Sequence, residues 1–193
     1  MSSETFKKKF LDQTLNIIKK KLKVILLLLV FILTILLVFL FYKDVQEKKI
    51  IVVAENYNQA LIFIKQEKIL ESKTLLENVI NEDHPFYSPM ALYLLIDKNI
   101  VKDSQKIIVF FDKVLRNNYI DKENLNLIKI KKAIYLINLD NEKLIIETLN
   151  PIINSNSEWR NTAINLISEY FLSKNQNIKA NEYIQLLKNQ EKK

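Results

Sequence analysis

The longest apolar run in the chain covers residues 24–42, nineteen residues without a charge, a proline or a glycine. In a helix with a rise of 1.5 Å per residue, this run spans about 28 Å, close to the roughly 30 Å hydrocarbon core of a bilayer. Its only polar groups belong to Thr34 and Tyr42, so it lacks the polar stripe that is typical of a helix in a soluble domain. The pattern predicts a single transmembrane helix.

A cleaved signal peptide is the main alternative, because it also places an apolar stretch after basic residues near the N-terminus. Its apolar core usually has only about 7 to 15 residues and ends at a small-x-small cleavage site. Here the run ends in Phe39, Leu40, Phe41 and Tyr42, followed by Lys43, with no small residue to cut after. We therefore expect a permanent anchor.

Beyond the anchor, apolar residues recur at helical spacing in eight segments that clusters of Asn, Asp and Ser separate. The expected helices are 44–67 with 70–82, 88–98 with 103–117, 122–138 with 142–154, and 158–174 with 177–190. Strands are conceivable at 107–111 and 135–139, but both runs lie inside longer helical periods. Equivalent points in the second helices recur every 34 to 38 residues, which is the period of a helix-turn-helix solenoid. The predicted fold class is all-α, with one N-terminal transmembrane helix followed by about four helical hairpins.

Local signals set the details of the first two hairpins. The first expected helix carries an apolar stripe at Ile50, Ala54, Tyr57, Leu61 and Ile64, and whether the anchor continues into this helix stays open.

A stop follows the second expected helix at Asp83-His84-Pro85, because the residue before a proline is pushed out of the α region. Ser88 is then expected to cap the third helix, with Pro89 in its first turn.

The net charge of +7 is concentrated at the N-terminus. Residues 1–23 hold seven lysines against Glu4 and Asp12, which gives +5, and the remaining 170 residues carry only +2. Lysines next to a span are retained on the cytoplasmic side. We therefore divide the chain into a basic cytoplasmic leader (1–23), a transmembrane helix (24–42) and a domain outside the cytoplasm (43–193), which in a Gram-negative cell is the periplasm. The leader is either a basic amphipathic helix on the inner leaflet or a disordered tail.

The composition leaves little room for catalysis. Cysteine and glycine are both absent, which excludes disulfides, thiolate metal sites and glycine-dependent phosphate loops. His84 is the single histidine; it precedes Pro85 at a helix break and is expected to be a surface loop residue. The acidic clusters at 82–84 and 140–142 lack metal-site spacing and are interpreted as caps and turns. We expect no enzyme activity, no cofactor, no metal and no small-molecule substrate. The nearly neutral domain also argues against nucleic acid as a partner.

The last two expected helices resemble the tetratricopeptide repeat, which needs small side chains where its helices cross and large ones beside them. The residues that carry this resemblance are Ile164, Ile167, Ser168, Phe171, Ala180, Ile184 and Leu187. The first pair resembles it more loosely, through Ala60, Phe63, Ser72, Leu76 and Val79, although Asn56 and Gln59 fill its first two large positions. The middle pairs retain only Ser104, Ile108 and Phe111, or Ala133 and Leu136.

Together with the anchor, the chain resembles the YfgM-like family of single-pass bacterial inner-membrane proteins with a periplasmic tetratricopeptide-like domain. The segment Ser157-Glu158-Trp159-Arg160 is similar to the start of the family's last repeat. The resemblance implies an ancillary factor of the Sec translocon that works with periplasmic chaperones on emerging proteins.

Stacked helical hairpins form a concave surface that suits a peptide or a partner helix. The expected function is therefore a membrane-anchored protein interaction module beside the Sec translocon, and the alternative is a structural scaffold in envelope assembly or cell division. The candidate partner-binding residues are Tyr93, Tyr119, Tyr135, Trp159, Arg160, Tyr170 and Tyr183. Each also lies near a packing stripe; core packing is the alternative role for the tyrosines, and a plug at a helix start is the alternative for Trp159 with Arg160.

Overall fold

The computed structural model describes the backbone of residues 3–188, and the side chains of these residues apart from 3–8, 10, 13, 16–20, 25 and 44–47. This part of the chain is entirely helical outside its turns. Its helices are α1 (Ser3–Lys65), α2 (Ile69–Asn81), α3 (Tyr87–Asp97), α4 (Ser104–Leu115), α5 (Lys122–Asn138), α6 (Glu142–Ile153), α7 (Arg160–Ser173) and α8 (Asn177–Lys188). The all-α prediction is confirmed, and the runs 107–111 and 135–139 lie within α4 and α5.

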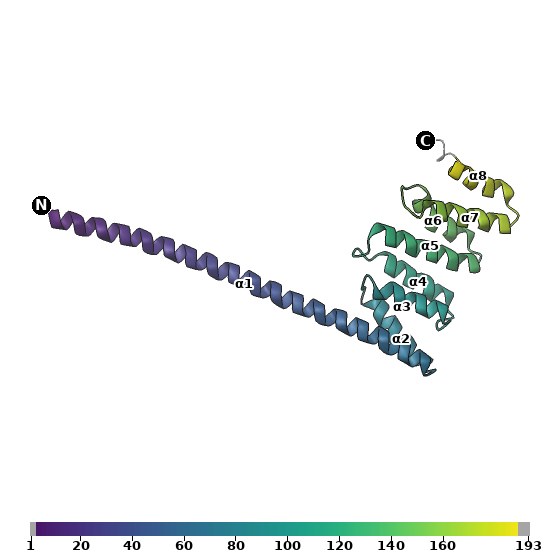
Figure 1. The fold of residues 1–193 in the computed structure, drawn as a ribbon, viewed down its shortest axis with the longest axis horizontal. Coiled ribbons are helices and arrows are strands. Elements are labelled where there is room, and N and C mark those ends of the chain that lie inside the picture. The colour runs from purple at the N-terminus through teal and green to yellow at the C-terminus, as the bar shows by residue number, and fades with distance from the viewer. Residues whose placement is uncertain (1–2, 189–193) are drawn as a thin grey trace. The chain divides into compact units, whose positions relative to one another are not determined.

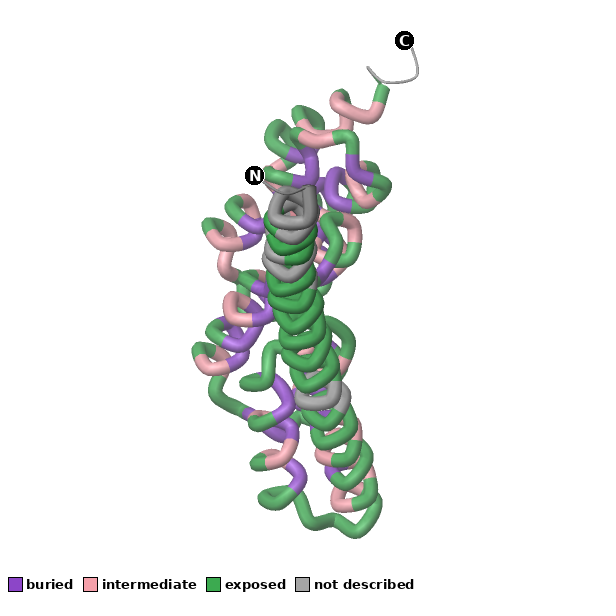
Figure 2. The backbone as a smooth tube through the Cα atoms, turned by 90° about the vertical axis from the view of Figure 1, so that its left-hand side faces the viewer, coloured by how far each residue is buried: buried purple, intermediate pink, exposed green. Residues whose placement is uncertain are grey.

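Helix α1 answers the question that the pattern left open about the anchor. The helix continues from Ser3 through the apolar run to Lys65 without a break. It is the one helix in the described part that is long and apolar enough to cross a membrane. Among the residues of 21–43 whose side chains are described, every one is exposed, as Figure 2 shows in green. Most leader side chains lie outside the described residues.

The chain divides into two compact units, Met1–Ile51 and Val52–Lys193. In the second unit, α2 packs on α3, α5 on α6, α6 on α7 and α7 on α8, and α5 also contacts α7 (Figure 1). Two hydrophobic clusters fill this unit. The first draws on the end of α1 through α5 and includes Leu76, Leu95 and Phe111, and the second runs from α4 to α8 and includes Leu149 and Phe171.

Four helical hairpins in the second unit close with the same turn. We number them hairpin 1 (residues 52–65 of α1, with α2), hairpin 2 (α3 and α4), hairpin 3 (α5 and α6) and hairpin 4 (α7 and α8). In each turn one residue has a positive φ: Glu67 at 60°, Asn99 at 51°, Asp140 at 54° and Asn175 at 59°. Its own N–H donates to the carbonyl three residues earlier, and the next N–H donates to the carbonyl five residues before it. This pair of bonds is the Schellman motif, in which glycine is the usual left-handed residue. Asn, Asp and even Glu replace glycine in this chain.

Burial follows the same register. The positions seven residues before and five residues after each left-handed residue are Ala60 and Ser72, Leu92 and Ser104, Ala133 and Ile145, and Ser168 and Ala180. All are buried except Ser104, which is half-buried. The second helices of the hairpins begin 35, 38 and 35 residues apart, within the predicted 34 to 38, whereas the left-handed residues recur less evenly, at intervals of 32, 41 and 35 residues. One reason is that α5 has 17 residues and α3 only 11.

The predicted stripe of α1 holds except at Ile50, whereas the predicted cap of α3 was wrong. The buried face of the last part of α1 is centred on Val53 and Ala60, flanked by Tyr57 and Ile64, whereas Ile50 is exposed. β-Branched residues occupy all of positions 50–53. The spacing of apolar residues therefore could not show which of these four side chains is buried.

Ser88 does not cap α3. Its hydroxyl is buried and donates to the carbonyl of Val79, which ties α3 to α2. The cap comes from His84, whose Nδ1 accepts hydrogen bonds from the N–H groups of Phe86 and Tyr87 at 3.1 and 3.2 Å. His84 is thus a half-buried capping residue rather than a free surface residue.

Candidate functional site

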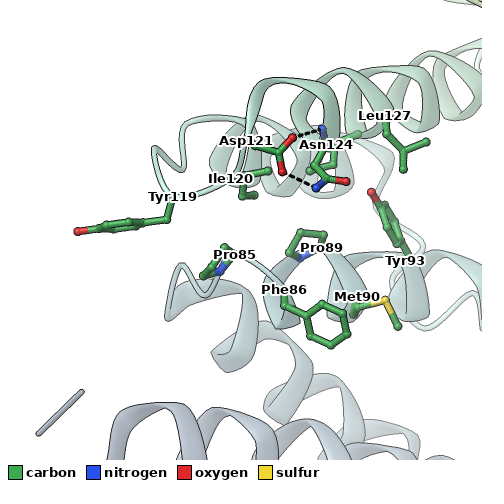
Figure 3. A pocket seen from close by; sticks show the side chains of 11 residues that line it. Pro85, Phe86, Pro89, Met90, Tyr93, Tyr119, Ile120, Asp121, Asn124 and Leu127 are labelled. Carbon is green, nitrogen blue, oxygen red and sulfur yellow. Dashed lines mark hydrogen bonds between the residues drawn. The ribbon is translucent and has the colours of Figure 1, made fainter. Parts of the chain in front are cut away.

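A cavity of about 320 Å³ opens between α3 and the start of α5. Figure 3 shows its two walls: Phe86, Pro89, Met90 and Tyr93 come from the α3 side, and Asn124 and Leu127 come from α5. The remaining lining residues are Pro85, Tyr119, Ile120, Asp121 and Ile128. The lining is mostly apolar, which is typical of a binding pocket.

A second cavity of about 270 Å³ lies further along the same two helices. It is lined by Tyr93, Ile96, Asp97, Phe111, Lys131, Ile134, Tyr135 and Asn138. Tyr93 lines both cavities. We call the two cavities together the α3–α5 groove.

The second cavity repeats the first at an offset of seven residues. Along α3, Pro89 and Met90 of the first cavity correspond to Ile96 and Asp97 of the second. Along α5, Asn124, Leu127 and Ile128 correspond to Lys131, Ile134 and Tyr135. Seven residues are close to two helical turns, or about 10.5 Å. The groove is therefore two similar pockets side by side.

Several apolar side chains of the groove stay open to solvent. Phe86, Met90 and Ile134 are all exposed, Ile134 to 47% of its full area. Phe86 also packs edge-on against Tyr87, with ring centroids 5.1 Å apart. An exposed apolar surface with a hollowed shape is typical of an interaction site.

Tyr93 is the central residue of the groove. Burial raises the pKa of its hydroxyl to about 12. The Lys131 ammonium lies over its ring, 4.7 Å from the centroid. This cation–π contact fixes Lys131 beside the boundary between the two pockets.

The polar residues at the ends of the groove differ in what they do. Asp121 caps α5, since its carboxylate accepts from the N–H of Asn124 at 3.0 Å and from the side-chain amide (Figure 3). These hydrogen bonds lower the pKa of Asp121. Asp97 is the last residue of α3, is exposed, and makes no ion pair within the described residues. Asp121 therefore holds the groove wall, whereas the Asp97 carboxylate is open to a partner.

The predicted partner-binding residues divide into two groups. Tyr93 and Tyr135 line the groove half-buried, and Tyr119 lies at its edge in the turn before α5, 85% exposed.

The other four residues lie in hairpin 4 or directly before it, away from the groove lining. Tyr170 is buried and its hydroxyl donates to Asp140, while Tyr183 stacks on Phe171 at 5.7 Å. Trp159 is half-buried against the second hydrophobic cluster, and the Arg160 Nε donates to the carbonyl of Ile153 at 2.7 Å.

Sequence reasoning missed Phe86, Met90, Lys131 and Ile134. A usable signal existed, because Leu127, Lys131 and Ile134 recur at helical spacing on α5 beside Tyr135. Their pairing with α3, however, depends on how hairpins 2 and 3 stack.

No cluster of three or more metal-ligating side chains occurs in the part of the chain that the structure describes. Comparisons with protein-family models, with curated proteins and with solved structures found no match to this chain.

Proposed function

We propose that this chain is a membrane-anchored protein interaction module that binds a partner in the α3–α5 groove and has no catalytic role of its own. The observation that carries the proposal is the groove, with two apolar pockets and solvent-exposed Phe86, Met90 and Ile134. Burying these side chains in a partner would remove apolar surface from water, which favours association.

The repeated hairpin register supports a tetratricopeptide-like solenoid as the scaffold. Four hairpins share one turn geometry, and all but one of the eight positions in the shared register are buried. In such solenoids, the first helices of successive hairpins line one face. The groove lies between α3 and α5, the first helices of hairpins 2 and 3.

The anchor and the leader charge suggest where the partner is found. The proposed topology places the basic leader in the cytoplasm and residues 43–193 in the periplasm of a Gram-negative cell. Given the resemblance to the YfgM-like family, Sec translocon subunits and a periplasmic chaperone are the first partners to test. A structural scaffold of envelope assembly or cell division remains the second candidate, since it would use the same groove.

Site-specific photo-crosslinking in living cells tests the proposal. A photoreactive amino acid replaces Ile134 in the groove, and the matched control carries it at Val109. Both residues are β-branched and about half exposed, at 47% and 53%, but Val109 lies on α4 outside the groove lining.

We expect a discrete adduct from position 134 and none from position 109. Sec subunits or a chaperone in the adduct would support the translocon assignment, and envelope or division proteins would support the scaffold. Equal labelling from both positions, or none from either, would contradict a binding role for the groove.

A further inference from the structure

We infer that the α3–α5 groove binds a proline-rich segment in the polyproline II conformation, with two apolar side chains three residues apart and a lysine or arginine next to the second. This inference rests on the proposed function and names the chemistry of the partner. Four properties of the groove lead to it: pocket spacing, free hydrogen-bond donors, aromatic lining and charge.

The spacing of the pockets selects the conformation of the ligand. The offset of seven residues on both walls separates the pockets by about 10.5 Å. In polyproline II, every third side chain points the same way, about 9.3 Å along the segment. In a β-strand, side chains on one face recur at about 6.6 or 13 Å, and neither distance fits. An α-helix matches the spacing through residues seven apart. The α-helix and polyproline II therefore remain as candidate conformations of the ligand.

The hydrogen-bond donors in the groove distinguish these two. Within the described residues, neither the hydroxyl of Tyr93 nor that of Tyr135 makes a hydrogen bond, and the Lys131 ammonium has only its contact with the Tyr93 ring. A polyproline II segment has no internal hydrogen bonds, so its carbonyls can accept from such donors. A helix uses its carbonyls internally, so it could offer these donors acceptors only from its side chains. The donors therefore favour polyproline II.

The aromatic lining favours proline itself. Phe86, Tyr93 and Tyr119 border the first pocket, and Phe111 and Tyr135 border the second. Aromatic-lined grooves recognise proline-rich segments because the rings pack on the pyrrolidine faces and the ligand is already extended before binding. Little conformational entropy is then lost on association.

The charge at the end of α3 selects a basic flank. The exposed Asp97 carboxylate lies at the C-terminus of α3, where the helix dipole is also negative. Lys131 lines the same pocket but forms no ion pair with Asp97. Lys98, the C-cap residue of α3, also lies beside Asp97 and forms no ion pair with it within the described residues. The carboxylate is therefore left for a partner cation beside the second pocket.

Peptide binding to the full-length chain in lipid nanodiscs tests the inference. The probe is a fluorescent capped peptide that contains Leu-Pro-Pro-Leu with lysine at one end, made with the lysine at either terminus. The controls contain one or three prolines between the leucines, or glutamine in place of lysine. An alanine-based helical peptide with leucines seven apart represents the helical alternative.

We expect saturable binding of the Leu-Pro-Pro-Leu peptide and at least tenfold weaker binding of both altered spacings. Tyr93→Phe should weaken binding about fivefold, the loss of one neutral hydrogen bond. Asp97→Asn should abolish the preference for lysine over glutamine. Ile134→Asp should weaken binding more than tenfold, whereas Val109→Asp should leave it unchanged, and circular dichroism checks that each variant stays folded.

Tighter binding of the helical peptide, or equal binding of all spacings, would overturn the inference. Absence of peptide binding while Ile134 still crosslinks to a protein in cells would also overturn it, but would leave the proposed function standing. Absence of both peptide binding and crosslinking would overturn the inference and the proposed function together.

Discussion

The Lys132 ammonium lies 2.6 Å from the Asp112 carboxylate and joins α5 to α4. Lys132 is only 7% exposed, whereas the Asp112 side chain is 42% exposed. The two partners of this ion pair therefore depend on each other unequally, because only the lysine would be left without water if the pair were broken.

This asymmetry predicts that two substitutions at the ion pair differ in their effect on stability. Asp112→Asn leaves a buried ammonium without its counter-charge and should lower the free energy of unfolding by about 1–3 kcal/mol. Lys132→Met replaces the buried cation with an apolar side chain of similar length and should change it by less than about 1 kcal/mol. Chemical denaturation of both variants, monitored by circular dichroism, makes the comparison. Equal destabilisation would show that burial of Lys132 is not the cause.

His84 should make the start of α3 sensitive to acid. Burial lowers the pKa of His84, and its Nδ1 must be unprotonated to accept from Phe86 and Tyr87. Since the folded chain favours neutral His84, the cap contributes its full stability above the ordinary histidine pKa of about 6.5. It is lost as the pH falls from there to the lowered folded value, because the unfolded chain takes up the proton first.

Amide exchange of α3 as a function of pH measures this effect, and the single histidine of the chain gives an unambiguous NMR titration. His84→Asn keeps a capping acceptor without a titrating group and should flatten the pH dependence. An unchanged slope in that variant would place the acid sensitivity elsewhere.

Glycine at the left-handed turn positions should stabilise the chain. Glu67 has φ of 60° in the turn of hairpin 1, a conformation that costs a residue with a Cβ about 1–2 kcal/mol. Glu67→Gly should raise the free energy of unfolding by about 0.5–1 kcal/mol after the greater entropy of glycine in the unfolded chain is included. Glu71→Gly, in the first turn of α2, should lower it. Both shifts can be measured by thermal unfolding.

A larger side chain at Ala60 should destabilise hairpin 1. Ala60 in α1 and Ser72 in α2 are both fully buried. Ala60→Leu adds volume to a site without space and should cost about 1–3 kcal/mol. Gln59→Leu changes an exposed neighbour on the same helix and should stay within about 0.5 kcal/mol. A tolerated Ala60→Leu would mean that the two helices can separate there.

The proposed topology can be tested by cysteine labelling, because the chain has no cysteine of its own. A membrane-impermeant maleimide added to spheroplasts should label Lys143→Cys, whose side chain is 84% exposed on α6. Ser2→Cys in the leader should react only after the membrane is opened, as expected for an N-terminus retained by its lysines. The reverse pattern would invert the orientation.

Much of the helical content followed from the sequence because its signals are local. The turns at 99–102, 138–141 and 174–177 were predicted from clusters of polar residues, and each contains the left-handed Asn or Asp that closes a hairpin. Predictions failed where a choice between local partners depended on packing. Serine is a common capping residue, but the Ser88 hydroxyl donates to the carbonyl of Val79 instead. His84 caps the helix in its place.

The candidate site was predicted only in part for the same reason. Tyr93 and Tyr135 were recognised as large side chains able to bind a partner, but tyrosines in the core share the same helical spacing. Tyr170 is buried and Tyr93 lines an open groove, although both lie on first helices of hairpins. The two tyrosines differ in register, since Tyr93 lies six positions before the left-handed Asn99 and Tyr170 five positions before Asn175. They differ also in their neighbours, because α5 and α7 are in contact, whereas cavities lie between α3 and α5.

The sequence by itself determined the apolar run at 24–42, the positions of the helices and the absence of glycine-dependent and cysteine-dependent chemistry, since these depend on composition and on residues a few positions apart. Only the tertiary structure decided which apolar side chains are buried and which line the groove, because that depends on the distance between helices that are about 30 residues apart in the chain. Helix periodicity specifies a face but not its neighbour, and the neighbour decides whether the face becomes core or binding surface.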